Sequence, residues 1–434
     1  MDTSFSPIEN YPFLSQFLLP EDYENHQEHS DELLTQLDEV WQRNKIQSKQ
    51  THEYLAAREN VFAEVILQYY HEHYRNLVEE SLHTKNSFEI LFKNTRLLDS
   101  IIQSAFEYAF SDLSILKKRI NEDLKKEYQF AKKSLQGKNK KLSHTREEIN
   151  KLETNNDDPD QRQLYKYYNS IKVELSNEID QQNERLLKLE EQLPLIPKSE
   201  LKREFLLNNF VIFARGGYGR AELSFASDKD LGYCLDTQQL NAAEAEICRQ
   251  FIIHIEHLLR KAGIVTAHQY FEIDEDLSRF KEPSTIHTIP SILESRVLLG
   301  SINLANALKR KFFQILPYEA FVLSQIRAYE QREVPELNQM NIKENKGGLR
   351  SLQIPLWLAA ATFGVFPSQT AEMLSLLIQK RIISPRQGFK LCQALEFFYD
   401  LRNFSATAKE FHFDDEARGS GLSDEDLQLN VIND

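Results

Sequence analysis

Residues 211–235 read VIFARGGYGRAELSFASDKDLGYCL, and this stretch decides the fold. The run FLLNNFVIFARGG at 205–217 has the composition of a β-strand that ends in glycines. Paired glycines such as Gly216 and Gly217 let the backbone approach a ligand closely and turn its N–H groups outward, which suits phosphate. Arg220 adds a forked cation that matches phosphate oxygens. The stretch therefore predicts a phosphate-binding loop at the end of a strand.

Two aspartates follow in the segment Ser227-Asp228-Lys229-Asp230, at the start of the next predicted strand. Because side chains alternate faces along a strand, Asp228 and Asp230 should project to the same side. Ionised carboxylates at that spacing repel each other, and a bound Mg²⁺ (or Mn²⁺) relieves the repulsion. A glycine pair alone is usually a turn, and an aspartate pair alone is usually a solvated strand end. Together they are the equipment for phosphoryl or nucleotidyl transfer.

The pattern of strand and helix continues outward from this stretch. The run AAEAEICRQFIIHIEHLLRKAG at 242–263 predicts a helix, and IVTAHQYFEI at 264–273 predicts a third strand. Residues 285–413 return to helical patterning, interrupted by NIKENKGGLRSLQ at 341–353. We therefore expect a mainly α protein with one small α+β core, in which a short mixed sheet packs with helices.

Residues 113–197 differ from both flanks because apolar residues recur there every three to four positions in an otherwise charged background. The two series are Leu124, Tyr128, Ala131, Leu135, Leu142, Ile149 and Leu152, then Leu164, Tyr168, Ile171, Leu175, Leu186, Leu189 and Leu193. The break TNNDDPD at 154–160 separates them. This pattern predicts an antiparallel coiled-coil hairpin with arms of roughly 50 Å. Such a hairpin serves as a charged spacer or dimer arm, or as a substrate-recruiting arm.

These patterns divide the chain into five parts. We expect an N-terminal helical region at 1–112, the hairpin at 113–197, the nucleotidyltransferase-like core at 198–285, a helical domain at 286–415 and an acidic tail at 416–434.

Composition narrows the functional class. The formal net charge of −14 disfavours non-specific nucleic-acid binding, which depends on lysine and arginine. The three cysteines match no zinc or disulfide spacing, the N-terminus does not resemble a signal peptide, and no run of 18 apolar residues occurs. These features are typical of a soluble cytoplasmic protein with no membrane partner.

The segment GGYGRAELSFASDKDL resembles the signature G-G-Y-G-R-G-E-L-x-P-x-S-D-x-D-L of the bacterial PII-protein uridylyltransferases, within the DNA-polymerase-β-like superfamily. A second block at 341–353 is similar to the family's N-I-K-E-x-x-G-G-L-R-D-x-Q. Weaker similarities are Gly263 with His268, and LEFFYDLRN at 395–403. The resemblance covers about residues 200–415 and leaves out the hairpin.

The resemblance implies Mg²⁺-dependent transfer of a nucleoside monophosphate from an NTP, UTP in this family, to a tyrosine hydroxyl of a small PII-type regulatory protein in nitrogen signalling. Asp228 and Asp230 would hold the metal, while Gly216, Gly217, Arg220 and Ser227 would bind the nucleotide. Lys343 and Arg350 flank a glycine pair from which they would reach the phosphates.

Several departures keep other functions open. Ala221 replaces a glycine of the signature, and Ser351 stands where the family has aspartate. Many superfamily members carry a third carboxylate on the later strand; here Glu272, with Asp274 beyond it, is the candidate catalytic carboxylate. The alternatives are a catalytically weak or inactive nucleotide-binding regulatory protein, or an adenylyltransferase with another acceptor.

The family's metal-dependent hydrolase and ligand-sensing domains have no counterpart in this sequence, which contains no His-Asp dipeptide. We therefore expect either a piece of a longer protein or a transferase-only form.

Overall fold

A four-stranded mixed sheet forms the centre of the protein, with the order β3-β2-β1-β4. The computed structural model describes residues 11, 13–14, 27–43, 51–84, 86–153, 159–192, 202–274, 277–282, 285, 288–332, 334, 341–364 and 367–413. The strands are β1 (Phe210–Ala214), β2 (Lys229–Leu235), β3 (Thr266–Glu272) and β4 (Arg296–Gly300). β1 pairs antiparallel with both β2 and β4, whereas β2 and β3 are parallel. The predicted mainly α protein with a small mixed sheet is confirmed.

Two details of the predicted sheet were wrong. The predicted strand at 205–217 is shorter, because residues Arg203–Asn209 form helix α6 and only Phe210–Ala214 extend. Residues 285–413 are not all helical, because Arg296–Gly300 form β4. The apolar run of β4 is too short to show a strand period. A side chain at Gly300 is excluded because its β-carbon would lie 2.2 Å from the Phe210 carbonyl oxygen.

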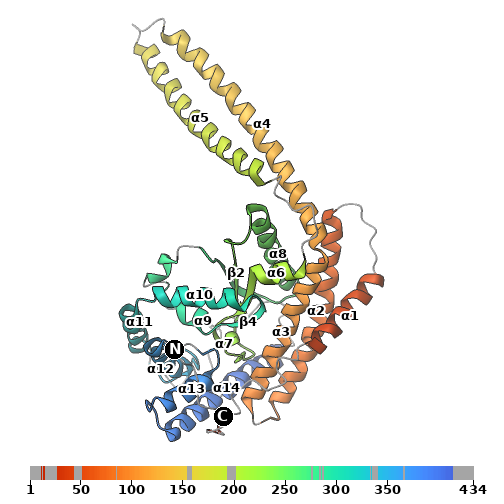
Figure 1. Cartoon of the computed structure of the whole chain (residues 1–434), viewed down its shortest axis with the longest axis vertical. Coiled ribbons are helices and arrows are strands. Elements are labelled where there is room, and N and C mark those ends of the chain that lie inside the picture. The colour runs from red at the N-terminus through yellow and green to blue at the C-terminus, as the bar shows by residue number, and fades with distance from the viewer. Residues whose placement is uncertain are drawn as a thin grey trace.

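Helices cover both faces of the sheet. On one face lie α8 (Ala242–Lys261) and the N-terminal helices α1 (Gln27–Arg43), α2 (Thr51–Ser81) and α3 (Ser87–Ser111), which share one hydrophobic core with β1 and β2. On the other face lie α9 (Ile289–Leu293) and α10 (Ile302–Ile315). Figure 1 shows the sheet between these two groups.

Four later helices form a third group beside the second face. These are α11 (Tyr318–Glu330), α12 (Leu349–Phe363), α13 (Thr370–Gln379) and α14 (Pro385–Phe413). The core that α12, α13 and α14 share includes Phe88 of α3 and Ala221 of the loop before β2, so these helices pack directly on the loop between β1 and β2. None of the described helices has the length and apolarity needed to cross a bilayer.

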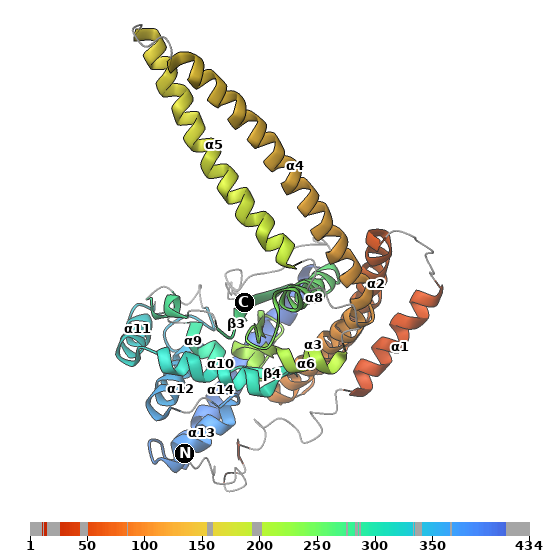
Figure 2. The ribbon, with the colours of Figure 1, turned by 45° about the horizontal axis from the view of Figure 1, so that its top comes forward.

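Two long helices, α4 (Leu113–Glu153) and α5 (Pro159–Gln192), lie side by side and project from the rest of the chain (Figures 1 and 2). Contacts between these arms pair Glu127 with Arg185, Tyr128 with Glu190 and Lys138 with Glu178. Lys138 lies later in α4 than Glu127, whereas its partner Glu178 lies earlier in α5 than Arg185, as in an antiparallel pair of helices. The predicted turn, with its residues 154–158, and the predicted acidic tail at 416–434 lie outside the described residues.

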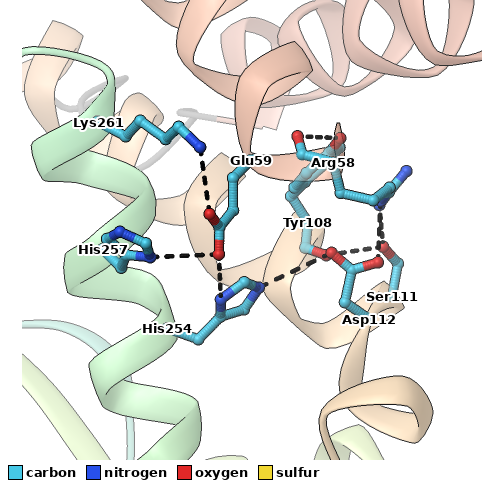
Figure 3. A network of polar contacts seen from close by, with 8 residues as sticks. All are labelled: Arg58, Glu59, Tyr108, Ser111, Asp112, His254, His257 and Lys261. Carbon is cyan, nitrogen blue, oxygen red and sulfur yellow. Dashed lines mark hydrogen bonds and ion pairs between the residues drawn. The ribbon is translucent and has the colours of Figure 1, made fainter. Parts of the chain in front are cut away.

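A buried polar cluster joins the root of this helix pair to α2 and α8. Arg58 Nε donates to Asp112 Oδ1 at 2.9 Å, and both side chains are at most 5% exposed. His254 of α8 lies between Glu59 and Asp112, at 3.8 Å from a carboxylate oxygen of each (Figure 3). Lys261 also reaches Glu59, at 3.2 Å. Ion pairs and polar contacts therefore join α2, α8 and the C-terminal end of α3 at the point where α3 passes into α4.

Candidate active site

The loop between β1 and β2 starts with a turn that only glycine fits well. Gly216 has φ +55°, in the left-handed region, and a β-carbon there would lie 3.2 Å from Asp230 Oδ2. A β-carbon at Gly219 would lie 2.8 Å from the Ala214 carbonyl oxygen. The short helix α7 (Gly216–Gly219) therefore folds back tightly against the end of β1 and beside the second aspartate.

Asp228 and Asp230 stand at the start of β2, on the face that α9 and α10 cover. Burial raises the pKa of Asp230 above its ordinary value, Arg215 lowers it, and Asp228 raises it further. The ion pair between Arg215 and Asp230 is loose, at 3.8 Å from Arg215 Nη2 to Asp230 Oδ1. Two carboxylates whose negative charges repel each other suit a divalent cation, which usually takes its other ligands from water and substrate phosphates. Among the residues that the structure describes, no group of three or more histidine, cysteine or acidic side chains forms a closed metal cage.

A cavity of about 330 Å³ lies in front of the pair, and we call it the aspartate cavity. It brings together eight of the nine predicted site residues: Gly216, Gly217, Arg220, Ser227, Asp228, Asp230, Lys343 and Arg350. The sequence places Lys343 and Arg350 more than a hundred residues after the aspartates. The fold, and not proximity in the sequence, therefore brings Lys343 and Arg350 into one cavity with the glycine loop.

Lys343 and Arg350 supply positive charge to the cavity that contains the aspartates. Both lower the pKa of Asp230, although less than burial raises it. The Arg350 guanidinium donates to Gln353 at 3.0 Å and lies 5.1 Å from the centre of the Trp357 ring. Arg402 of α14 also lines the cavity. Lys343, Arg350 and Arg402 thus come from the part of the chain that follows the sheet, whereas Arg215 and Arg220 come from the loop between β1 and β2.

Arg220 lines the cavity, as predicted from the sequence, and its guanidinium is held by two carboxylates. Its guanidinium donates to Glu222 at 2.7 Å and to Glu294 at 2.9 Å, and all three side chains are at most 9% exposed. Burial by itself lowers the pKa of Arg220, but the two carboxylates raise it well above its ordinary value. With its charge already matched twice, Arg220 suits the positioning of the loop better than the neutralisation of phosphate.

Glu222 connects this loop to the helical group behind it. The hydroxyl of Tyr399 in α14 donates to Glu222 at 2.6 Å, and Thr370 of α13 donates to its other oxygen. The next residues of α14 also reach the loop, because Arg402 donates to the Ala226 carbonyl at 3.0 Å. Glu222 is a matched position of the loop signature, and Tyr399 and Arg402 lie in the LEFFYDLRN block. Glu294 and Thr370 carried no signal in the sequence.

The structure does not bring Glu272 to the aspartate pair. In the parallel register Ala267 is the partner of Asp230, and Glu272 is the partner of Leu235 at the opposite end of the strands. Glu272 also projects to the α8 face, where it accepts from Arg249 at 2.8 Å. Asp274 accepts from the Thr237 hydroxyl. The β3 residues on the face of Asp230 near the pair are the neutral Ala267 and Gln269, so β3 supplies no carboxylate there.

Sequence comparisons agree with the motif-based prediction. Residues 320–405 match the family model described as GlnD PII-uridylyltransferase. A "bifunctional uridylyltransferase/uridylyl-removing enzyme" of Azospirillum brasilense is 29% identical over 201 residues, which cover 44% of this chain and 20% of the relative. A protein of the same name from Caulobacter vibrioides is 33% identical over 200 residues, with the same shares.

The matched part spans about a fifth of the length of these relatives. A similar protein from Phenylobacterium zucineum is 30% identical over 199 residues, again 20% of its length. The chain is therefore related to the PII-protein uridylyltransferase family, over a segment that includes residues 320–405.

Proposed function

We propose that the aspartate cavity binds a metal–NTP complex and transfers a nucleoside monophosphate, UMP by family resemblance, to a hydroxyl of a PII-type protein. The observation that carries the proposal is the placement of Asp228 and Asp230 in one cavity with Lys343 and Arg350. Two carboxylates in one cavity with two cations suit a bound metal together with phosphate oxygens. Gly216 leaves space for this arrangement because it has no side chain.

The chain's own residues would act by binding and positioning. A divalent cation held by Asp228 and Asp230 would supply charge neutralisation at the α-phosphate when bound. Gly216, Gly217 and Ser227 would contact phosphate oxygens together with Lys343 and Arg350 of the same cavity. The acceptor oxygen forms a bond to the α-phosphorus, the bond from this phosphorus to the bridging oxygen breaks, and pyrophosphate leaves with that electron pair. The hydroxyl proton passes to solvent.

Incorporation of label from α-³²P-NTPs into a purified PII protein, with Mg²⁺, tests this function. We expect label from UTP with the wild-type chain, and at least about a hundredfold less after Asp228→Asn with Asp230→Asn. The control is Asp274→Asn, which removes a carboxylate outside the cavity and should retain activity. Equal labelling by the double variant, or no labelling with any NTP, contradicts the transferase proposal. Label from ATP in place of UTP would instead support the adenylyltransferase alternative.

A second candidate function follows from the neutral side chains Ala267 and Gln269, which β3 places on the face of Asp230. With Ala267 next to Asp230, the cavity has no third carboxylate from this strand to take the acceptor proton, which favours a slow enzyme or a nucleotide-binding regulatory protein. Ala267→Asp tests this, because it places a carboxylate beside the pair. A rise in labelling rate of about tenfold or more would indicate a slow enzyme that lacks a base. If nucleotide binds but neither chain transfers label, the regulatory function is favoured.

We also propose that α4 and α5 pack as a coiled coil that serves as a spacer or dimer arm. Its support is a buried stripe that includes Ala131, Leu142 and Ile149 on α4 and Ile179 and Leu189 on α5. Sedimentation equilibrium of the full chain and of a chain with 121–192 replaced by a short glycine-serine linker distinguishes the two roles. A dimer that becomes a monomer on deletion indicates a dimer arm, and an unchanged oligomeric state indicates a spacer.

A further inference from the structure

The edge of the sheet next to the aspartate pair borders a second cavity. β3 is an edge strand, and between it and α8 lies a groove of about 420 Å³, which we call the α8–β3 groove. Its walls include Tyr233 of β2, Ile252 and Ile253 of α8, and His268 and Tyr270 of β3. Ile253 is 55% exposed and Val265, just before β3, is 71% exposed. Figure 2 labels both elements that border the groove.

The polar groups at the floor of the groove satisfy one another. Glu256 of α8 is buried and accepts from the hydroxyls of Tyr233 and Thr266, the latter at 2.7 Å. His268 Nδ1 lies 3.5 Å from the same carboxylate. The floor therefore already has its hydrogen-bond partners, and the isoleucine and tyrosine walls are left to contact a ligand. An inserted group should be apolar or aromatic.

An edge strand offers a second kind of contact. In a strand with one parallel neighbour, alternate residues direct their backbone N–H and C=O groups away from the sheet, where another strand pairs with them. Within the described residues, β3 has no strand partner other than β2. A helix beside an open strand edge, with an apolar groove between them, suits an extended peptide that adds one strand to the sheet.

Alternation along an added strand links the groove to the aspartate cavity. Thr266, His268 and Tyr270 project to the groove side of β3, whereas Ala267 projects to the side of its partner Asp230. On an added strand, one side chain would enter the groove while its neighbour faces the aspartates. That neighbour would start about 10 Å from β2, which is two strand spacings. A tyrosine hydroxyl spans such a gap better than a serine hydroxyl does.

We infer that β3 docks an extended segment of the protein acceptor as an added strand, with an apolar side chain in the α8–β3 groove and the adjacent hydroxyl residue over the aspartate cavity. This inference rests on the proposed function, because it assigns the acceptor's binding mode. Arg260 at the rim has no ion pair among the described residues, and Arg249 there pairs with Glu272 at 2.8 Å. Arg260 therefore provides positive charge at the rim that favours an acidic flank on the docking segment.

Calorimetric binding of a purified PII protein to the full chain, without nucleotide, tests the docking mode. We expect Ile253→Glu to weaken binding by about tenfold or more, since it places a charge in the groove. Ile302→Glu is the matched control: Ile302 is 61% exposed and follows β4, at the opposite edge of the sheet. Its binding should equal that of the wild type.

Hydrogen–deuterium exchange gives a second readout that does not depend on a substitution. The amides of residues 266–272 should exchange more slowly when the PII protein is bound, whereas those of β4 should not change. Absence of binding, equal effects of the two glutamate variants, or unchanged exchange in β3 overturns the docking inference. Metal-dependent NTP binding, measured separately, should be equal in both variants. A wrong docking inference is therefore distinguishable from a wrong assignment of the nucleotide site.

Discussion

Gly216 and Asp230 are in such close proximity that a β-carbon on the glycine would lie 3.2 Å from the carboxylate oxygen Oδ2 of the aspartate. The glycine also has φ +55°, which costs other residues about 1–2 kcal/mol. Backbone conformation and side-chain space thus both disfavour a side chain at this position. The neighbouring Gly217 differs, because its β-carbon would make only an ordinary contact, at 3.5 Å from the Glu222 carbonyl oxygen.

We expect Gly216→Ala to weaken metal-dependent nucleotide binding by about tenfold, because 1–2 kcal/mol of strain falls beside Asp230. Gly217→Ala keeps the same backbone N–H and meets no close atom, so its affinity should be close to that of the wild type. Titration of a fluorescent NTP analogue in the presence of Mn²⁺ measures both. Equal losses in the two variants would show that the space beside Asp230 is not what the glycine provides.

Removal of the Tyr399 hydroxyl tests the connection between the loop and α14. Tyr399→Phe deletes a buried 2.6 Å hydrogen bond to Glu222, and such a bond to a charged group contributes about 1.5–3 kcal/mol. We expect a loss of that size in urea unfolding. Tyr318→Phe removes an exposed hydroxyl that lies 3.0 Å from Thr362 and should cost less than about 0.5 kcal/mol. Similar values for the two variants would contradict a structural role for the Glu222 network.

The Arg58–Asp112 pair gives a prediction for the root of the helix pair. Arg58→Leu leaves the buried Asp112 carboxylate without its 2.9 Å partner, so we expect a loss of about 3–5 kcal/mol in the free energy of unfolding. Adding Asp112→Asn removes the unpaired charge and should restore part of that loss. If the double variant is as unstable as the sum of the two single variants, the residues do not interact as the structure indicates.

The raised pKa of Asp230 predicts a pH-dependent stability difference. In the metal-free chain a raised folded-state pKa contributes stability that is present at low pH and is lost as pH rises through that pKa. Asp230→Asn keeps the group neutral throughout, so it should stabilise the metal-free chain more at pH 7 than at pH 4. Urea unfolding of both chains with chelator at the two pH values measures this. A difference that is constant or larger at pH 4 would show that the pKa is not raised.

Local sequence was sufficient to predict the loop, the aspartate pair and the two long helices. Each depends on neighbours in the chain: glycines at a strand end, alternation across Asp228 and Asp230, and a heptad spacing. That Lys343 lines the same cavity as the aspartates was predictable only through the family resemblance. Strand β4 was missed because five residues carry too little periodicity.

Sequence patterns could not assign Glu272 to a face of the sheet. Its face depends on the register of β2 against β3, and a shift by one residue moves every side chain to the other side. The pairing of Arg220 with Glu294 was not predictable for a similar reason, because Glu294 directly follows α9, far along the chain. Long-range register and long-range pairing are the two quantities that a single sequence does not specify.

Binding of a non-hydrolysable UTP analogue with Mn²⁺ tests the central claim most directly, because both the enzyme and the regulatory function require it. Calorimetry should show one site per chain that is lost with chelator and lost in the variant with Asp228→Asn and Asp230→Asn. The Asp274→Asn control should bind as the wild type does. Nucleotide binding that is unchanged in the double variant, or that is independent of metal, would contradict the assignment of the aspartate cavity.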